Sequence, residues 1–194
     1  MSMMVMLAAL WMSMFAQIAP GLATAPSVEA PSITLAQSSI PRTHGQSTRE
    51  VVAFPNSERP GTIIISNEDL TLHRVIDSRT AERFRISAGK PGAIWTGVTY
   101  VGMKREWPSW RPTASMRARD SRLPAYVPPG PLNPMGARAL YLFSDGRDTL
   151  YRIHGTATAD TVGTFETAGC FRMTNRDVID LFDRVAVGTR VIVH

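Results

Sequence analysis

Short apolar runs separated by turn residues make up most of the sequence from Thr62 to its end. Runs of a few residues that alternate with polar side chains are typical of strands and too short for helices. Gly, Asn, Asp and Pro punctuate them as turns. The predicted strands lie around Thr62–Ser66, Leu70–Val75, Arg83–Ile86, Val98–Met103, Ala139–Phe143, Leu150–His154 and Arg190–Val193. We therefore expect a mostly β fold, a twisted mixed or antiparallel sandwich or a partial barrel.

One helix is predicted near the C-terminus. Its apolar residues recur at helical spacing: Val178, Leu181, Phe182 and Val185. Thr174 or Asn175 can cap its start, and Gly188 lies just beyond its end. The sequence thus adds a short C-terminal helix to the β fold.

The segment from Lys104 to Arg138 differs from its surroundings because half of the chain's 14 prolines fall in it. It is too long for an ordinary hairpin loop. Two interpretations remain open and are compatible: an irregular excursion that covers one face of the sheet, or the lid or wall of a cleft.

The N-terminus reads as a targeting segment. Met3 to Ala19 is nearly all apolar, and Ala23-Thr24-Ala25 has the small residues of a cleavage site. We expect a signal peptide at 1–25, cleaved after Ala25, which places the mature protein in the periplasm. Because no Lys or Arg precedes the run, an uncleaved membrane anchor is the alternative. Residues 26–59, rich in Pro, Ser and Thr, are expected to be a flexible linker, and 60–194 the folded domain.

The charge distribution excludes one class of partner. Basic residues number 21 and acidic residues 16, which gives a net charge of +5. The charges are scattered without a basic block, so we expect no nucleic-acid partner. The three histidines other than His154 (His44, His73 and His194) have no metal-ligand spacing, so no metal site is expected.

Cys170 is the single cysteine, so the chain cannot form an internal disulfide. It lies sixteen positions after His154, far enough for a loop to bring the imidazole next to the thiol. There the imidazole could take the proton of the thiol. Gly169 would let backbone N–H groups turn towards a carbonyl oxygen, and Arg172 would point to the same side as the thiol in an extended chain. Spacing alone leaves a second interpretation: a buried Cys, a structural His and a surface Arg.

The ordered set of motifs resembles the L,D-transpeptidase catalytic domain of the YkuD family over about 60–193. The resemblance rests on His154-Gly155, on Thr167-Ala168-Gly169-Cys170-Phe171-Arg172-Met173, on Trp107-Pro108-x-Trp110, on 133–142 and on the helix after Asn175. Ala168 stands where the family often has His or Ser, and its small apolar side chain removes one potential hydrogen bond near the thiol.

The resemblance implies a transferase of peptidoglycan biosynthesis and cell wall organization, and thereby of cell shape. Cys170 would be the nucleophile, His154 the proton donor and acceptor, and Gly169 the backbone of the oxyanion hole. The Gly155 backbone would orient His154. Substrate would contact three side chains: Arg172, Tyr141 and Trp110.

The implied reaction passes through a thioester on a tetrapeptide stem and needs no cofactor. The acyl group would go to a second stem as a 3→3 cross-link, or to an outer-membrane protein as a tether to the wall. Attack by water would make the protein an L,D-carboxypeptidase. A non-catalytic peptidoglycan-binding module that kept the fold is the other alternative.

Overall fold

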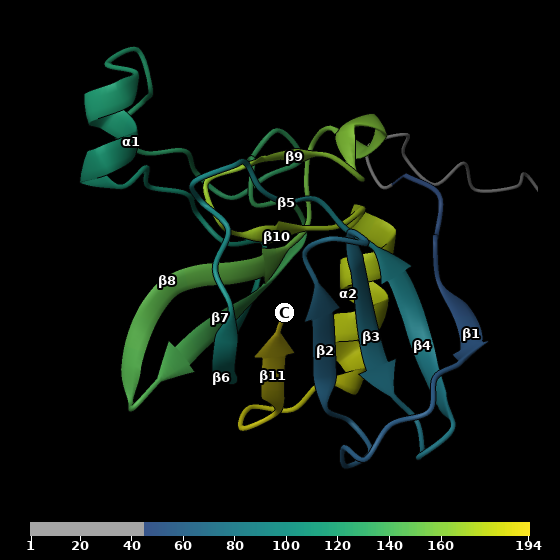
Figure 1. Ribbon diagram of the computed structural model, residues 1–194. Helices are drawn as coiled ribbons and strands as arrows, with labels where there is room; N and C mark the ends of the chain where they lie inside the picture. The colour runs from purple at the N-terminus through teal and green to yellow at the C-terminus, as the bar shows by residue number, and fades with distance from the viewer. Residues whose placement is uncertain (1–44) are drawn as a thin grey trace, which may run out of the picture. The chain divides into compact units, whose positions relative to one another are not determined.

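A nine-stranded mixed sheet forms the framework of residues 45–194, the part of the chain that the computed structural model describes (Figure 1). Its strands in spatial order are β1 (Glu50–Ala53), β4 (Thr80–Arg85), β3 (Thr71–Val75), β2 (Ile63–Ser66), β11 (Arg190–Val193), β6 (Gly97–Glu106), β7 (Arg138–Ser144), β8 (Arg147–His154) and β10 (Phe171–Arg172). Two neighbouring pairs are parallel, β11 with β2 and β10 with β8, and the others are antiparallel. The prediction of a mostly β fold is confirmed.

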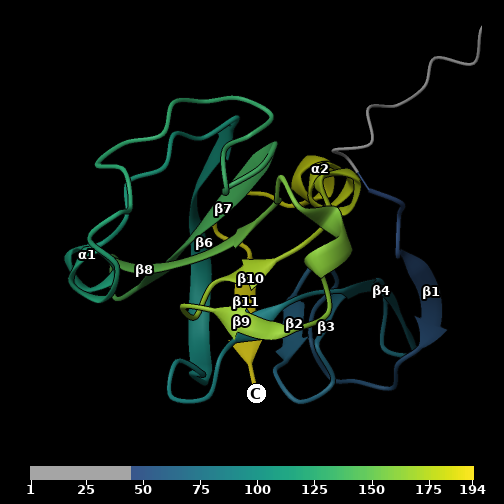
Figure 2. The ribbon, with the colours of Figure 1, turned by 90° about the horizontal axis from the view of Figure 1, so that it is seen from above.

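The remaining elements are few and short. A second, two-stranded sheet pairs β5 (Ala88–Gly89) with β9 (Phe165–Thr167) in parallel. The helices are α1 (Ala114–Arg119), the 3₁₀ turn η2 (Ala159–Thr161) and α2 (Asn175–Arg184). Figure 2 shows β6, β7 and β8 on one side of the sheet and β1–β4 on the other, with β10 and β11 between them. All seven strands predicted from the sequence are present.

The core forms where the alternation of the strands meets the apolar stripe of α2. On β2, Ile63 and Ile65 are fully buried while Ile64 between them is only half-buried, as a period of two requires. Val178 and Leu181 of α2 are fully buried in the same cluster. The Thr174 hydroxyl accepts the Asp177 N–H at 3.1 Å, so the predicted cap and helix are confirmed.

The stretch expected to be a flexible linker is ordered from residue 45 onwards, which differs from the expectation. Glu50–Ala53 forms β1 and pairs with β4. Before it, Thr48 donates both its backbone N–H (3.0 Å) and its hydroxyl (2.8 Å) to the buried Asp177 carboxylate, and the Ser47 hydroxyl donates to it at 2.8 Å. These bonds tie the N-terminal arm to α2. The predicted signal peptide at 1–25 and residues 26–44 lie outside the described residues.

The proline-rich segment is an excursion that joins β6 to β7. It carries α1, which stands at the edge of the molecule in both views (Figures 1 and 2). Trp110 and Val127 close it on itself through two backbone hydrogen bonds of 2.9 and 2.8 Å. Within residues 45–194, no helix has the length and apolarity needed to cross a membrane. The alternative of an N-terminal anchor falls on residues that the structure does not describe.

Candidate active site

A cavity of about 240 Å³ opens onto Cys170 between the excursion and strands β7 and β8. Its lining residues are Ser109, Trp110, Arg111, Thr113, Met116, Met135, Tyr141, Leu150, Arg152 and Cys170. Three residues singled out in the sequence, Cys170, Tyr141 and Trp110, therefore meet in one hollow. The proline-rich excursion forms one wall of this hollow, which agrees with the interpretation of that segment as the wall of a cleft.

The pairing of β10 with β8 positions the thiol. Phe171 is paired with Ile153 and Arg172 with His154, and Phe171 and Ile153 are fully buried in the core. Because side chains alternate along a strand, Cys170 and His154 both lie on the face opposite to the core. Cys170 directly precedes β10, so the thiol and the imidazole lie on one face of the β8–β10 pair, two residues apart in the continued register.

Hydrogen bonds on both sides fix the turn that precedes the thiol. The Trp95 indole N–H donates to the Gly169 carbonyl at 3.0 Å, and the Thr167 hydroxyl donates to the Cys170 carbonyl at 2.6 Å. Gly169 has φ +114°, and a Cβ there would lie 2.6 Å from a ring carbon of Tyr151. Only glycine fits this backbone conformation in this space.

His154 is held from its own backbone. The ring is 8% exposed, and its Nδ1 lies 2.6 Å from the Gly155 carbonyl oxygen. Since a carbonyl can only accept, Nδ1 carries the proton in the neutral ring, and the lone pair of the base is on Nε2. The Met135 backbone also forms a hydrogen bond with the ring. A Cβ on Gly155 would lie 2.2 Å from Oδ1 of the buried Asn175, so a side chain at this position would push the loop away from α2.

The surroundings of both groups favour their neutral forms. Burial, helped by the charges of Arg172 and Arg152, lowers the pKa of His154 to about 4, although hydrogen bonds to the Gly155 and Met135 backbones act in the opposite direction. Burial raises the pKa of the Cys170 thiol, which the Arg152 backbone N–H and guanidinium partly offset. The thiol donates a long 3.9 Å bond to the Leu150 carbonyl, and within residues 45–194 no hydrogen bond joins it to His154.

Arg152 is a site residue that the sequence reasoning missed. Its guanidinium donates two bonds, of 2.7 and 2.8 Å, to the two oxygens of Asp148 and lies 4.1 Å from the centre of the Tyr141 ring. It lines the same cavity as Cys170. The sequence could have indicated it, because Arg152 lies two residues before His154 on one strand and therefore shares its face.

Arg172 lies on the expected side, paired in register with His154, but its guanidinium is held by other groups. Its guanidinium donates to the Glu166 carboxylate at 2.9 Å and to the Thr161 carbonyl at 3.4 Å, and it does not line the Cys170 cavity. Its charge still reaches His154, whose pKa it lowers. Among the residues from 45 to 194, no group of three or more His, Cys, Asp or Glu side chains is placed to hold a metal ion.

A family of known domains and several curated proteins match this chain. The L,D-transpeptidase catalytic domain (YkuD) matches residues 60–193. A probable L,D-transpeptidase of Escherichia coli, ErfK/SrfK, is 39% identical over 161 residues, which cover 78% of this chain and 50% of that protein. The chain therefore corresponds to about half the length of this relative.

Solved structures carry the same fold. A Brucella melitensis protein described as a probable carnitine operon oxidoreductase is 44% identical, with a TM-score of 0.52 over 75% of this chain and 92% of the other. The catalytic domain of the Enterococcus faecium L,D-transpeptidase, acylated by ertapenem, has a TM-score of 0.52 over 72% of this chain and 100% of the other. At 22% identity, the second likeness shows the fold alone. On the match over residues 60–193, the chain belongs to the YkuD family of L,D-transpeptidase catalytic domains.

Proposed function

We propose that this protein is a cysteine-dependent L,D-transpeptidase that acts on peptidoglycan tetrapeptide stems. The observation that carries the proposal is the placement of Cys170 in a cavity, with His154 on the adjacent strand and on the same face. A thiol at such a position needs a neighbouring base, and a neutral imidazole that is unprotonated at Nε2 is one.

The reaction follows from these groups. His154 Nε2 takes the thiol proton while Sγ attacks the carbonyl at the L-centre of diaminopimelate, and the carbonyl electrons move to oxygen. The intermediate collapses to a thioester, and D-Ala leaves as an amine that receives the proton from His154. An acceptor amine then attacks the thioester carbonyl and gives a proton to His154. The C–S bond breaks as the new amide forms, and His154 returns the proton to the Cys170 thiolate.

The neutral pair suits this order of events. An imidazole with a pKa of about 4 is unprotonated at neutral pH and ready to accept a proton. The weak 3.9 Å thiol bond to Leu150 is easily exchanged for one to His154, and catalytic hydrogen bonds often tighten only when substrate is bound. Arg152, which partly offsets the raised pKa of Cys170, would stabilise the thiolate as it forms.

The bonds around Gly169 support an oxyanion site at Cys170. The Cys170 N–H belongs to the same peptide as the Gly169 carbonyl, and in a trans peptide the two point in opposite directions. By binding that carbonyl, Trp95 fixes the direction of the N–H. A donor held in place before the reaction can stabilise the charge on the carbonyl oxygen without reorganising.

Intact mass after incubation with a carbapenem tests the nucleophile, because the fold neighbour from Enterococcus faecium is one acylated by ertapenem. We expect one adduct on the wild type and none on Cys170→Ala. An adduct that persists in the variant would reject Cys170. Release of D-Ala from a tetrapeptide by wild type only is the matching activity assay, and its absence from wild type would point to a non-catalytic module.

The compartment and the acyl acceptor are also proposals. We place the mature protein in the periplasm after cleavage behind Ala25, and the intact mass of protein recovered from that compartment reports the cleavage site. Muropeptide analysis of cells that overproduce the protein separates the acceptors. More 3→3 cross-links indicate a stem as acceptor, more tripeptides indicate water, and a protein bound to the wall indicates tethering.

A further inference from the structure

Two guanidinium groups line the Cys170 cavity, and only one of them is neutralised. Arg152 is held by both oxygens of Asp148. Arg111 lies over the Tyr126 ring, 4.5 Å from its centre, and forms no ion pair with any carboxylate of residues 45–194. None of the residues that line the cavity is acidic. The mouth of the nucleophile's cavity therefore carries an exposed positive charge without a counter-charge.

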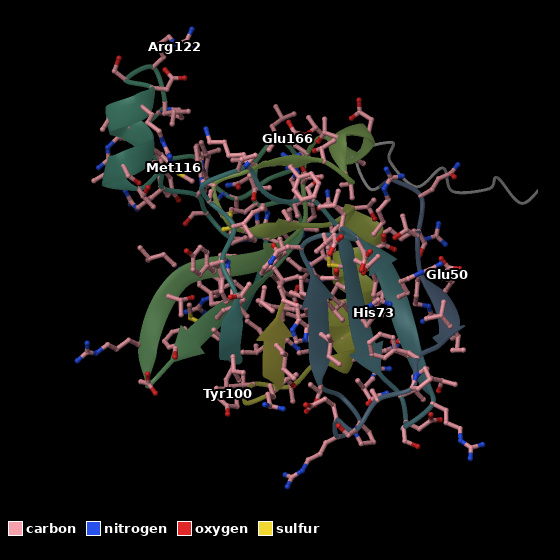
Figure 3. The ribbon with its side chains drawn as sticks, viewed as in Figure 1. Glu50, His73, Tyr100, Met116, Arg122 and Glu166 are labelled. Carbon is pink, nitrogen blue, oxygen red and sulfur yellow. The ribbon has the colours of Figure 1, made fainter. Side chains whose placement is uncertain are left out.

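The backbone around Arg111 is braced. The preceding residue, Trp110, exchanges two backbone hydrogen bonds with Val127, and the Asn133 side-chain amide donates to the Val127 and Pro128 carbonyls at 3.1 and 2.8 Å. Arg111 thus projects from a closed part of the excursion. Figure 3 shows Met116, which also lines the cavity, on α1, and Arg122 at the outer end of the excursion. A fixed group loses less freedom on binding than a mobile one.

We propose that Arg111 binds a carboxylate of the donor stem peptide at the mouth of the Cys170 cavity, and so takes the part that the sequence suggested for Arg172. The inference rests on the proposed function for the identity of the peptide. Two carboxylates of a tetrapeptide stem lie on the residues joined by the bond that reacts, one at the D-centre of diaminopimelate and one on the terminal D-Ala. The planar fork of a guanidinium matches either. The other two arginines already form ion pairs, Arg172 with Glu166 and Arg152 with Asp148.

Binding is measured by calorimetry on the Cys170→Ala protein, which separates recognition from turnover. The ligands are the tetrapeptide, the same peptide amidated at the D-centre, and the same peptide amidated at its terminus. We expect Arg111→Gln to raise the Kd of the unmodified tetrapeptide roughly tenfold. Arg119→Gln is the matched control, because Arg119 is also an exposed arginine of the excursion that forms no ion pair within residues 45–194, and it does not line the cavity. It should leave the Kd unchanged.

The two amides identify the carboxylate. Amidation of the carboxylate that Arg111 binds should raise the Kd for the protein that keeps Arg111 by the same roughly tenfold factor. The same amidation should not raise the Kd further in the Arg111→Gln variant. An unchanged Kd in Arg111→Gln, an equal loss in Arg119→Gln, or no binding by either protein would overturn the inference. Absence of D-Ala release by wild type would overturn the proposed reaction instead, whatever the binding data show.

Discussion

The bond from the Trp95 indole to the Gly169 carbonyl makes one substitution especially informative. Trp95→Phe removes the N–H donor and keeps an aromatic ring against Tyr151, whose ring is stacked on that of Trp95 at 4.3 Å. The Gly169–Cys170 peptide then loses the bond that sets its direction. We expect the chemical step to slow while substrate binding is kept.

The size of the effect follows from the bond itself. A neutral hydrogen bond contributes about 1 kcal/mol net, and each 1.36 kcal/mol in a barrier is tenfold in rate. If all of this free energy serves to hold the Cys170 N–H in place in the transition state, its loss lowers kcat about fivefold to tenfold. Complete loss of an oxyanion donor costs about 10²–10³, which is the upper limit for this substitution. In stability, ~1 kcal/mol amounts to a fall in Tm of ~2–4 °C in a domain of this size.

The assay is D-Ala release from a tetrapeptide, with kcat and KM determined separately and acylation by a carbapenem followed in a single turnover. Trp107→Phe is the matched control, since the indole N–H that it removes has no acceptor among residues 45–194. A Trp95→Phe protein that folds and keeps kcat within twofold of wild type would refute the positioning role. So would a change confined to KM, because it would mean that the bond serves binding in the ground state.

Two further predictions concern stability. The pKa of His154 falls from 6.5 in the unfolded chain to about 4 in the folded protein. Between these pH values the unfolded chain binds more protons, so the free energy of unfolding decreases as the pH falls from about 6.5 to 4. His154→Gln should remove up to about 3 kcal/mol of this pH dependence in urea titrations, and an unchanged profile would contradict the shift. Thr48→Val removes the hydroxyl bonds to Asp177 and to the Arg85 N–H, each 2.8 Å, and should cost about 2 kcal/mol, or ~4–8 °C in Tm. The buried hydroxyl of Thr71 has no hydrogen-bond partner, so Thr71→Val should cost no stability. Equal losses in the two valine variants would refute the stabilising role of the Thr48 hydroxyl bonds.

Elements that carry their own periodicity could be predicted from the sequence, and elements that depend on distant partners could not. The apolar residues of β2, β11 and α2 mark their buried faces directly. β1 has no such mark, since three of its four residues are exposed and its order comes from pairing with β4. Likewise α1 buries no residue, so its sequence has no apolar stripe to read.

In the candidate site, too, local patterns could be predicted and contacts with distant residues could not. Strand alternation correctly places Cys170 and Arg172 on one side, but it says nothing of Glu166, which reaches Arg172 from the crossover and takes its charge away from the cavity. Tyr141 and Trp110 could be named only through the family resemblance, and the cavity places both beside the thiol. Arg111 has no local signal, because its position depends on how the excursion closes on itself.

The interval between the two reactive groups is itself a consequence of the fold. β10 runs parallel to β8, and a parallel pair cannot be joined by a tight turn; it needs a crossover of a dozen or more residues. The crossover here is the run between His154 and Phe171, and it contains η2 and β9. It also supplies the Thr161 carbonyl and the Glu166 carboxylate that hold Arg172, and the Thr167 hydroxyl that holds the Cys170 carbonyl. The residues that separate His154 and Cys170 in sequence are thus the ones that fix β10, the strand that begins directly after Cys170.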